Sequence, residues 1–484
     1  MRYVIGLDVG TTCVKALLFD ETGNIVSSAK YDDELFTPCQ GWAEQDAEHW
    51  TKLSAKVIQS IITGSAVDPG AVAALAISSQ GLTIVPVDGS FKPLRNAINW
   101  LDQRSTEETD YIRSLKSDEE IYAVTGKSIM PGYSLTNILW IKRNEPEIYS
   151  RAAKLLLPHD YLCARFTGNP VTDHTLAGGT MLYDIPGQCW SEELLEIYDI
   201  DRDLLPELKW SGMLAGSITT EASRLLGLPE GTPVITGGQD QKVAAYGACL
   251  KPGLATISLG TCAAMEFYFD SPPTHPERGL AAFSYMKPGA WLLEACVPTA
   301  GAAVKWAGDT LFPVLDFDGI ESLAGSCKTS GGVFFYPHLQ GSGTPYNVSS
   351  RGTFTGLSLS TTQTELARSV YEGIAMEVHL NLLSAEEAGI DVREMCVFGG
   401  ASNSRLLCQM LADVTGRAIR AFDMPEMGAF GAAKLAAEAA GIESFAMPSG
   451  RWFEPDASKK TIYDELYFAY TENLGLVMEL YQRK

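Results

Sequence analysis

One pattern occurs twice in the chain and restricts the folds that it can adopt. It is an apolar run, a tight turn that contains Gly-Thr, and a second apolar run that ends in Phe-Asp. The two copies are IGLDVGTTCVKALLFD, residues 5–20, and ATISLGTCAAMEFYFD, residues 255–270. Short apolar runs around a glycine turn predict antiparallel strand pairs. We therefore expect strands at 3–9, 14–19, 254–259 and 264–269, in two related halves.

The rest of the chain fits a two-part α/β organisation. Its 484 residues favour more than one domain. Lys251-Pro252-Gly253 precedes the second copy and predicts a boundary, so we expect one domain over 1–248 and another over 249–484. Helices are predicted near 46–64, from 240, and after the capping box at Thr362-x-x-Glu365.

Composition limits the kinds of partner that the protein could bind and the cellular compartment in which we expect it. The net charge of -22 argues against nucleic acid or an anionic membrane as a partner, although it leaves room for a local positive pocket. No apolar run approaches the ~20 residues that span a bilayer, and Asp8 interrupts the stretch where a signal peptide would be apolar. The ten cysteines show no Cys-x-x-Cys spacing. We expect a cytoplasmic protein without a zinc or redox motif.

The two Gly-Thr turns are candidate phosphate cradles. A strand followed by such a turn leaves backbone N–H groups and hydroxyls free for phosphate oxygens. Either turn alone is better explained as an ordinary hairpin, but two turns facing one another would hold a polyphosphate from both sides. Asp8 in the first copy is Ser258 in the second. One carboxylate is enough if it orients a Mg²⁺ that also binds phosphates and water. Lys15 is either an added point charge or a surface lysine.

Several further segments carry a family resemblance. They are GTFTGLSLSTTQTELARSVYE (352–372), GYSLTNILWIKRN (132–144), QGWAEQDAEHW (40–50), WLDQR (100–104), LPHDYL (157–162) and the SLGT turn that begins at 258. From about residue 3 to about residue 440 the chain resembles the FGGY carbohydrate kinases, within the actin, hexokinase and Hsp70 ATPase superfamily. It departs at Asn137, where the family usually has lysine.

This resemblance implies a fold and an activity. The expected fold is α/β, with two actin-like (ribonuclease H-like) ATPase domains and a cleft between them. The N-terminal domain would bind the sugar and supply the catalytic base, and the C-terminal domain would bind the nucleotide. The implied reaction is ATP- and Mg²⁺-dependent phosphorylation of a small sugar or polyol. The oligomeric state stays open, with a homodimer as one candidate.

The stretch TGGQDQ, residues 236–241, contains the candidate base. On the residues alone, Asp240 is equally well explained as a helix cap or as a carboxylate aimed at a substrate hydroxyl. The resemblance implies that Asp240 is the base and that Gln241 is its polar neighbour at the substrate. It also implies that Asp8 organises Mg²⁺ and the transferred phosphate, with Asp8 and Asp240 both reaching the metal through water.

The resemblance also implies contacts to the nucleotide. Taken alone, the glycines among these residues are explained as well by turns or helix packing. The expected contacts are Thr11, Thr12, Lys15, Gly260, Thr261, Gly301, Lys305, Gly400 and Ser404.

The acceptor is indicated by residues that differ from those of its relatives. The resemblance is strongest to xylulose kinases, which carry Met-His where this chain has Gly81-Leu82. A sugar hydroxyl facing Leu82 would lose a hydrogen-bond partner. D-xylulose, phosphorylated to D-xylulose 5-phosphate, is the first candidate; ribulose, a glycerol-like or erythritol-like polyol, and a sugar acid are alternatives. The expected substrate contacts are Gln80, Gly81, Leu82, Trp100, Asp102, Asp240 and Gln241.

A function of another class shares the two turns. An actin- or Hsp70-like ATPase without sugar kinase activity would use the same phosphate loops to move a partner. It would not need GQDQ beside a cleft or the FGGY-like segments. Hydrolysis of ATP that is independent of any sugar would identify it.

Overall fold

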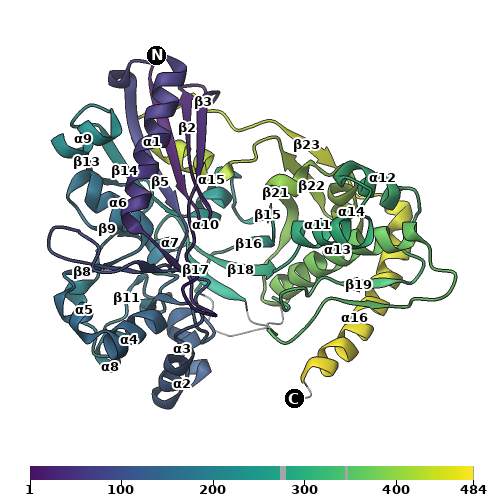
Figure 1. Cartoon of the computed structure of the whole chain (residues 1–484). Helices are drawn as coiled ribbons and strands as arrows, with labels where there is room; N and C mark the ends of the chain where they lie inside the picture. Colours follow the sequence, from purple (N-terminus) through teal and green to yellow (C-terminus); the bar gives the residue numbers. More distant parts are fainter. Residues whose placement is uncertain (273–279, 344–346, 483–484) are drawn as a thin grey trace.

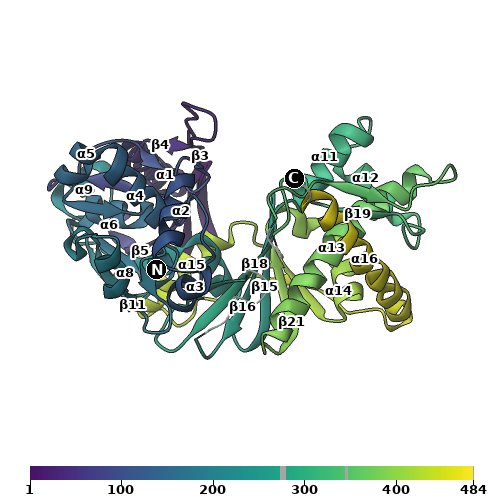
Figure 2. The same cartoon turned by 90° about the horizontal axis from the view of Figure 1, so that it is seen from below.

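The chain forms two α/β lobes (Figure 1). The computed structural model describes residues 1–272, 280–343 and 347–482. Within those ranges no helix is both long enough and apolar enough to cross a membrane. The lobes lie side by side and meet along one side of the molecule. There, β15 (Gly253–Leu259), β16 (Ala263–Phe269), β18 (Trp291–Val297) and α15 (Met427–Ala439) lie between them (Figure 2).

The N-terminal half is built on a six-stranded sheet in the order β13-β14-β5-β1-β2-β3. β1 pairs antiparallel with β2 and parallel with β5, and β14 continues the parallel part beyond β5. β1 is almost wholly apolar because helices cover both faces of the sheet, as in other parallel sheets. The strands are β1 (Tyr3–Val9), β2 (Cys13–Asp20), β3 (Ile25–Asp32), β5 (Val72–Ser79), β13 (Leu214–Ser217) and β14 (Pro233–Gln239).

The C-terminal half repeats this arrangement in a seven-stranded sheet, in the order β17-β18-β16-β15-β21-β22-β23. β15 pairs antiparallel with β16 and parallel with β21, as β1 does with β2 and β5. The predicted pair of related halves is therefore confirmed. The strands are β15 (Gly253–Leu259), β16 (Ala263–Phe269), β17 (Ala281–Ser284), β18 (Trp291–Val297), β21 (Val392–Phe398), β22 (Ala418–Phe422) and β23 (Gly450–Phe453).

The two copies of the turn differ in length, which their likeness in sequence does not reveal. In the first copy Val9 pairs with Val14, and in the second Leu259 pairs with Ala263. The second turn is therefore one residue shorter. The N–H of Gly10 donates to the Cys13 carbonyl at 3.0 Å, whereas that of Gly260 donates to the Cys262 carbonyl at 2.9 Å.

The N-terminal lobe also contains a helical layer beyond the sheet (Figure 1). The predicted helix near 46–64 is α1, which Asp46 caps by accepting the N–H of Glu48 at 2.9 Å. The remaining elements are β4 (Glu44–Gln45), α1 (Ala47–Ser65), β6 (Val85–Val87), β7 (Ala97–Ile98), α2 (Thr106–Leu115), α3 (Asp118–Thr125), α4 (Ser134–Asn144), α5 (Pro146–Arg151), β8 (Lys154–Leu156), α6 (Pro158–Thr167), β9 (Val171–Asp173), α7 (His174–Ala177), β10 (Tyr183–Asp184), β11 (Cys189–Trp190), α8 (Glu192–Ile197), β12 (Glu207–Lys209), α9 (Thr220–Leu226) and α10 (Asp240–Gly247).

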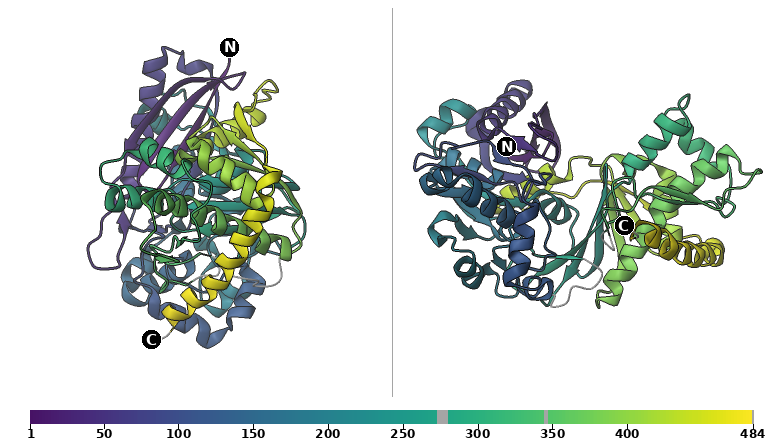
Figure 3. Two further views of the ribbon diagram at one scale, coloured as in Figure 1. Left: turned by 90° about the vertical axis from the view of Figure 1, so that its right-hand side faces the viewer. Right: turned by 60° about the horizontal axis from the view of Figure 1, so that its bottom comes forward.

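In the C-terminal lobe the long helix α13 packs beside the sheet, and α16 runs along the outside (Figure 3). Thr362 and Glu365 form the predicted capping box at the start of α13. The remaining elements are α11 (Gly301–Leu311), α12 (Phe317–Gly325), β19 (Phe334–Tyr336), β20 (Thr353–Thr355), α13 (Gln363–Glu387), α14 (Arg405–Thr415), α15 (Met427–Ala439) and α16 (Lys460–Gln482).

Helix α15 ties the two halves together, because it comes from the second half of the chain but packs on β1, β5 and α10. The approach is close enough to require glycine. A Cβ added at Gly6 would lie 1.8 Å from the carbonyl oxygen of Ala429, and one at Gly431 would lie 2.0 Å from that of Val243. The sheet of the first half and the helix of the second therefore share one hydrophobic core.

Candidate active site

Asp8 lies near the end of β1, directly before the first Gly-Thr turn. The sheet register places it between Lys15 on β2 and Ser78 on β5. The Ser78 hydroxyl donates to Asp8 Oδ1 at 2.9 Å. Burial raises the pKa of the Asp8 carboxyl above its ordinary value, and Lys15 and the Ser78 hydrogen bond partly oppose this.

Lys15 is held in this group rather than being a free surface side chain. Its ammonium contacts the Glu426 carboxylate at 2.5 Å, and its side chain is half-buried. Its position opposite Asp8 on the neighbouring strand leaves it within reach of an anion bound at the turn.

Asp240 is the first residue of α10 and lies at the C-terminal end of β14. Gln239 is the N-cap, and Asp240 accepts the N–H of Gln241 at 2.8 Å. Asp240 is therefore not the capping residue, although it does satisfy one N–H of the first turn. Burial, and then the charge of Asp8, raise the pKa of the Asp240 carboxyl to about 7. Asp8 is thus close enough for its charge to oppose the ionisation of Asp240.

Asp240 also lies near the second Gly-Thr turn. A hydrogen bond with Cys296 lowers the pKa of the Cys262 thiol in that turn, and the charge of Asp240 acts in the opposite direction. The carboxyl of Asp240 therefore interacts electrostatically with a residue beside each turn: Asp8 acts on it at the first turn, and it acts on Cys262 at the second.

A buried lysine behind Asp240 was not found from the sequence. Lys242 is fully buried in α10 and forms ion pairs with Glu266, at 2.9 Å, and with Glu294. Its pKa is raised because these carboxylates outweigh the effect of burial. The residue stands two positions after Asp240, but nothing in its spacing distinguishes it from a surface lysine.

The first Gly-Thr turn is joined to the predicted sugar-binding residues. The hydroxyl of Thr11 donates to Gln80 Oε1 at 3.0 Å and accepts the indole N–H of Trp100 at 2.9 Å. Gln80 is buried, whereas Trp100 is 40% exposed and is free to contact a ligand with its ring. Thr12 is exposed, and its carbonyl accepts the N–H of Asp33 at 2.8 Å.

Two residues that sequence reasoning passed over organise the same network. Gln45 donates to the Thr11 carbonyl at 2.9 Å and accepts from Gln80 at 2.8 Å. Asn99 donates to Gln45 Oε1 at 2.8 Å and to Gln80 Oε1 at 3.1 Å. Both are fully buried. Gln45 lies inside the family-like segment 40–50, and Asn99 directly precedes the segment 100–104. These positions were the sequence signal that could have identified both residues.

Asp102 does not present its carboxylate to the cleft, contrary to the expectation that it would hold sugar hydroxyls. It is fully buried and accepts four hydrogen bonds, three from Arg104 at 2.8–2.9 Å and one from the N–H of Ala43 at 2.5 Å. A carboxylate has about four acceptor sites, so none is left for a ligand. Arg104 also lies over the ring of Trp42, 3.7 Å from its centroid.

Gly81 and Leu82 follow Gln80, and Leu82 has an unusual backbone conformation. Leu82 has a positive φ of 66°, which is uncommon for a residue other than glycine. Its carbonyl accepts the hydroxyl of Ser134 at 2.8 Å, and its side chain lies against Gly179. Gly81 is buried, whereas Gln241, in the first turn of α10, is partly exposed.

The second turn borders a cavity of about 550 Å³. Gly301 lets the start of α11 approach this turn, because a Cβ there would lie 2.4 Å from the Gly260 carbonyl oxygen. Gly400 has open space beside it. Five of the nine predicted nucleotide contacts line the cavity, namely Gly260, Thr261, Gly301, Lys305 and Gly400. The other lining residues are Ala302, Phe317, Ala401 and Asn403.

Two of the predicted nucleotide contacts are engaged within the protein. Ser404 does not line the cavity; it is buried and caps α14 by accepting the N–H of Leu407 at 3.0 Å. Lys305 does line the cavity, but its ammonium pairs with Asp309 at 2.7 Å on the exposed side of α11.

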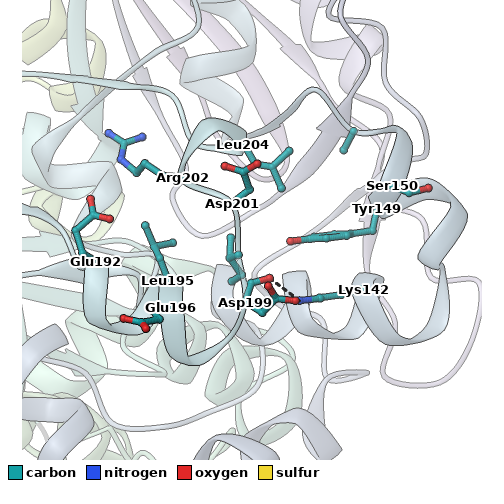
Figure 4. A pocket seen from close by; sticks show the side chains of 12 residues that line it. Lys142, Tyr149, Ser150, Glu192, Leu195, Glu196, Asp199, Asp201, Arg202 and Leu204 are labelled. Atoms are coloured by element: carbon teal, nitrogen blue, oxygen red, sulfur yellow. Dashed lines mark hydrogen bonds and ion pairs between the residues drawn. The ribbon is translucent and has the colours of Figure 1, made fainter.

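A larger cavity of about 790 Å³ lies elsewhere, among α4, α5 and α8 (Figure 4). Lys142 and Asp199 form an ion pair at its edge, 2.6 Å apart, and Tyr149 lies along one side. It contains none of the predicted site residues, so we place the chemistry at the two turns.

Comparison with known proteins agrees with this geometry. The model of the N-terminal domain of the FGGY family of carbohydrate kinases matches residues 3–247, and that of the C-terminal domain matches residues 255–440. A xylulose kinase of Lactococcus lactis subsp. lactis is 30% identical over 96% of this chain and 95% of its own. A glycerol kinase of Burkholderia multivorans is 33% identical over 91% of this chain and 90% of its own.

A solved structure gives the same result for the fold. The ligand-bound xylulose kinase from Lactobacillus acidophilus has a TM-score of 0.92 at 26% identity and covers all of both chains. The expected fold class is thereby confirmed, and the alternative of an actin- or Hsp70-like ATPase without sugar kinase activity is wrong, because both halves match carbohydrate kinases. The chain belongs to the FGGY family of carbohydrate kinases and is a sugar kinase.

Proposed function

We propose that this kinase transfers the γ-phosphate of ATP to a hydroxyl of a small ketose, with D-xylulose as the acceptor and D-xylulose 5-phosphate as the product. The relatives named xylulose kinase support this choice. The glycerol kinase relative is equally similar, so ribulose, a glycerol-like or erythritol-like polyol and a sugar acid are the acceptors to compare.

The observation that carries the proposal is the position and acidity of Asp240. Its pKa of about 7 makes it a base that takes a proton near neutral pH. It lies at the end of β14, within the electrostatic reach of Asp8 at one turn and of Cys262 at the other. A phosphoryl group held between the turns would therefore be close to the same carboxyl that receives the proton of the acceptor hydroxyl.

The residues for a nucleotide and for an acceptor come from different halves. The cavity beside the second turn would take the nucleotide, with the backbone of Gly260 and Thr261 facing its phosphates. The exposed ring of Trp100, joined to Thr11 and Gln80, would lie against the acceptor. Closing the lobes on both would exclude water, which is a competing acceptor.

The two carboxyls fit a divalent cation. The charge of Asp8 raises the pKa of Asp240, and a bound cation would offset this repulsion. Mg²⁺ is commonly bound through one or two carboxylates together with phosphates and water. When bound, it would neutralise charge on the phosphates during transfer. Asp8 would orient the cation and the transferred phosphate, while Asp240 would take the proton of the acceptor hydroxyl.

Release of ADP from the purified protein, measured with a panel of acceptors, tests the proposal. The panel is D-xylulose, D-ribulose, glycerol, erythritol and D-gluconate, with a no-acceptor control. We expect the highest kcat/KM with D-xylulose and only slow ADP release without an acceptor. Replacing Asp240 with asparagine should lower kcat by ~100-fold or more. Near-normal turnover by that variant would refute the assignment of the base.

A further inference from the structure

Gln239, the residue before Asp240, has a buried side-chain oxygen without a partner. Among the described residues, its Oε1 makes no hydrogen bond. A buried acceptor left unpaired destabilises the protein, because its hydrogen bonds to water are lost without replacement. The backbone of Gln239 is fixed, because it pairs with Ser79 in the sheet and its N–H donates to Thr175 Oγ1 at 2.9 Å. The Oε1 atom of Gln239 could therefore accept a hydrogen bond from a bound ligand.

Gly81 provides the space in which this side chain lies. A Cβ added at Gly81 would be 3.0 Å from Gln239 Cγ and 3.3 Å from its Nε2. Even alanine at 81 would therefore push the Gln239 side chain aside by a few tenths of an ångström. Gly81 lies just beyond β5, and Gln239 is the last residue of β14, so the absence of a side chain at 81 and the long side chain at 239 complement one another where the two strands end.

This pair lies between the proposed base and the acceptor network. Gln239 directly precedes Asp240, and Gly81 directly follows Gln80, which bonds to Thr11. A carboxamide offers both a donor and an acceptor, which suits a hydroxyl group. The position is therefore suited to a hydroxyl next to the one that is phosphorylated.

We propose that Gln239 binds a hydroxyl of the acceptor and helps to determine which acceptor is used. The ligand class is a polyhydroxylated small molecule with a second hydroxyl beside the reacting one. This inference rests on the proposed function. Gly81 acts indirectly, as the residue that leaves room for the Gln239 side chain.

Acceptor kinetics with D-xylulose and with the best alternative in the panel test the role of Gln239. In Gln239→Ala we expect KM for the acceptor to rise at least 10-fold, with kcat and KM for ATP changed less than 3-fold. Gln59→Ala is the matched control, because Gln59 is exposed and bonds to the Leu225 carbonyl, away from the cleft. If Gln239→Ala does not fold, Gln239→Met keeps the length of the side chain without its polar atoms.

A double-mutant cycle tests the pairing with Gly81. Gly81→Ala should raise KM for the acceptor in the wild-type background but have little further effect in Gln239→Gly, where no side chain is left to displace. An equal effect in both backgrounds would overturn the pairing. An unchanged acceptor KM in Gln239→Ala would overturn the inference alone. A wild-type enzyme that phosphorylates no acceptor would overturn the proposed function and this inference together.

Discussion

Replacing Asp240 with asparagine should stabilise the fold at neutral pH even though it removes the proposed base. The pKa of Asp240 is raised from its ordinary 3.8 to about 7. A group with a raised pKa holds its proton more tightly in the folded state than in the unfolded state. For an acid, this means that the ionised form destabilises the fold. The cost is absent below about pH 4, grows from pH 4 to 7, and is constant above.

The size of this cost follows from the same two values. Each tenfold difference in acidity corresponds to about 1.36 kcal/mol, so a rise from 3.8 to about 7 gives a ceiling of about 4 kcal/mol. Asp240 is only partly buried, and water screens part of the effect. We therefore expect a gain of about 1–2 kcal/mol for Asp240→Asn at pH 8. Asparagine keeps an oxygen that accepts the N–H of Gln241.

Urea unfolding of the wild type and of Asp240→Asn, at pH 5 and at pH 8, measures the difference in their free energies of unfolding. The gain should be about two to three times larger at pH 8 than at pH 5, because the cost grows from pH 3.8 only up to the folded pKa of about 7 and is incomplete at pH 5. Asp316→Asn is the control, because Asp316 is an exposed N-cap of α12 and asparagine caps equally well. A variant that is less stable at pH 8, or whose gain does not depend on pH, would show that Asp240 is not strained by burial and by Asp8.

Three further outcomes are expected. Gly6→Ala should lower the unfolding temperature markedly, because its Cβ would lie 1.8 Å from the Ala429 carbonyl oxygen; an unchanged midpoint would contradict the packing of α15 on β1. Lys242→Met should destabilise the fold by about 3–5 kcal/mol in urea, since Glu266 and Glu294 would lose their buried partner; a stability equal to wild type would show that these carboxylates are protonated. EDTA should abolish ADP release and added Mg²⁺ should restore it; activity that persists in EDTA would exclude the metal.

Some members of the candidate site could be predicted because their chemistry is local. Asp8, Thr11 and Gly260 stand in or beside strand–turn–strand patterns that are visible in the chain, and Asp240 follows a double glycine at a helix start. The structure brings Asp8 and Asp240 together through the parallel pairing of β1, β5 and β14. Their assigned roles stay predictions.

Other members depended on partners far away in the chain. Gln45 and Asn99 look like ordinary polar residues until β4 and β7 place them against Gln80. Asp102 looked like a sugar ligand, but folding surrounds it with Arg104 donors. The side chain of Gln239, whose Oε1 is buried without a partner, lies against Gly81, far away in the chain.

By itself, the amino-acid sequence determined the two related halves, the family and the kinase chemistry. Strand and turn propensities act over a few residues, and the family-like segments can be read without coordinates. Only the tertiary structure decided which side chains are free to meet a ligand and how acidic they are. Burial, pairing and repulsion between carboxyls depend on distances between residues that lie up to hundreds of positions apart. The pKa of Asp240, raised by burial and by Asp8, is the clearest example.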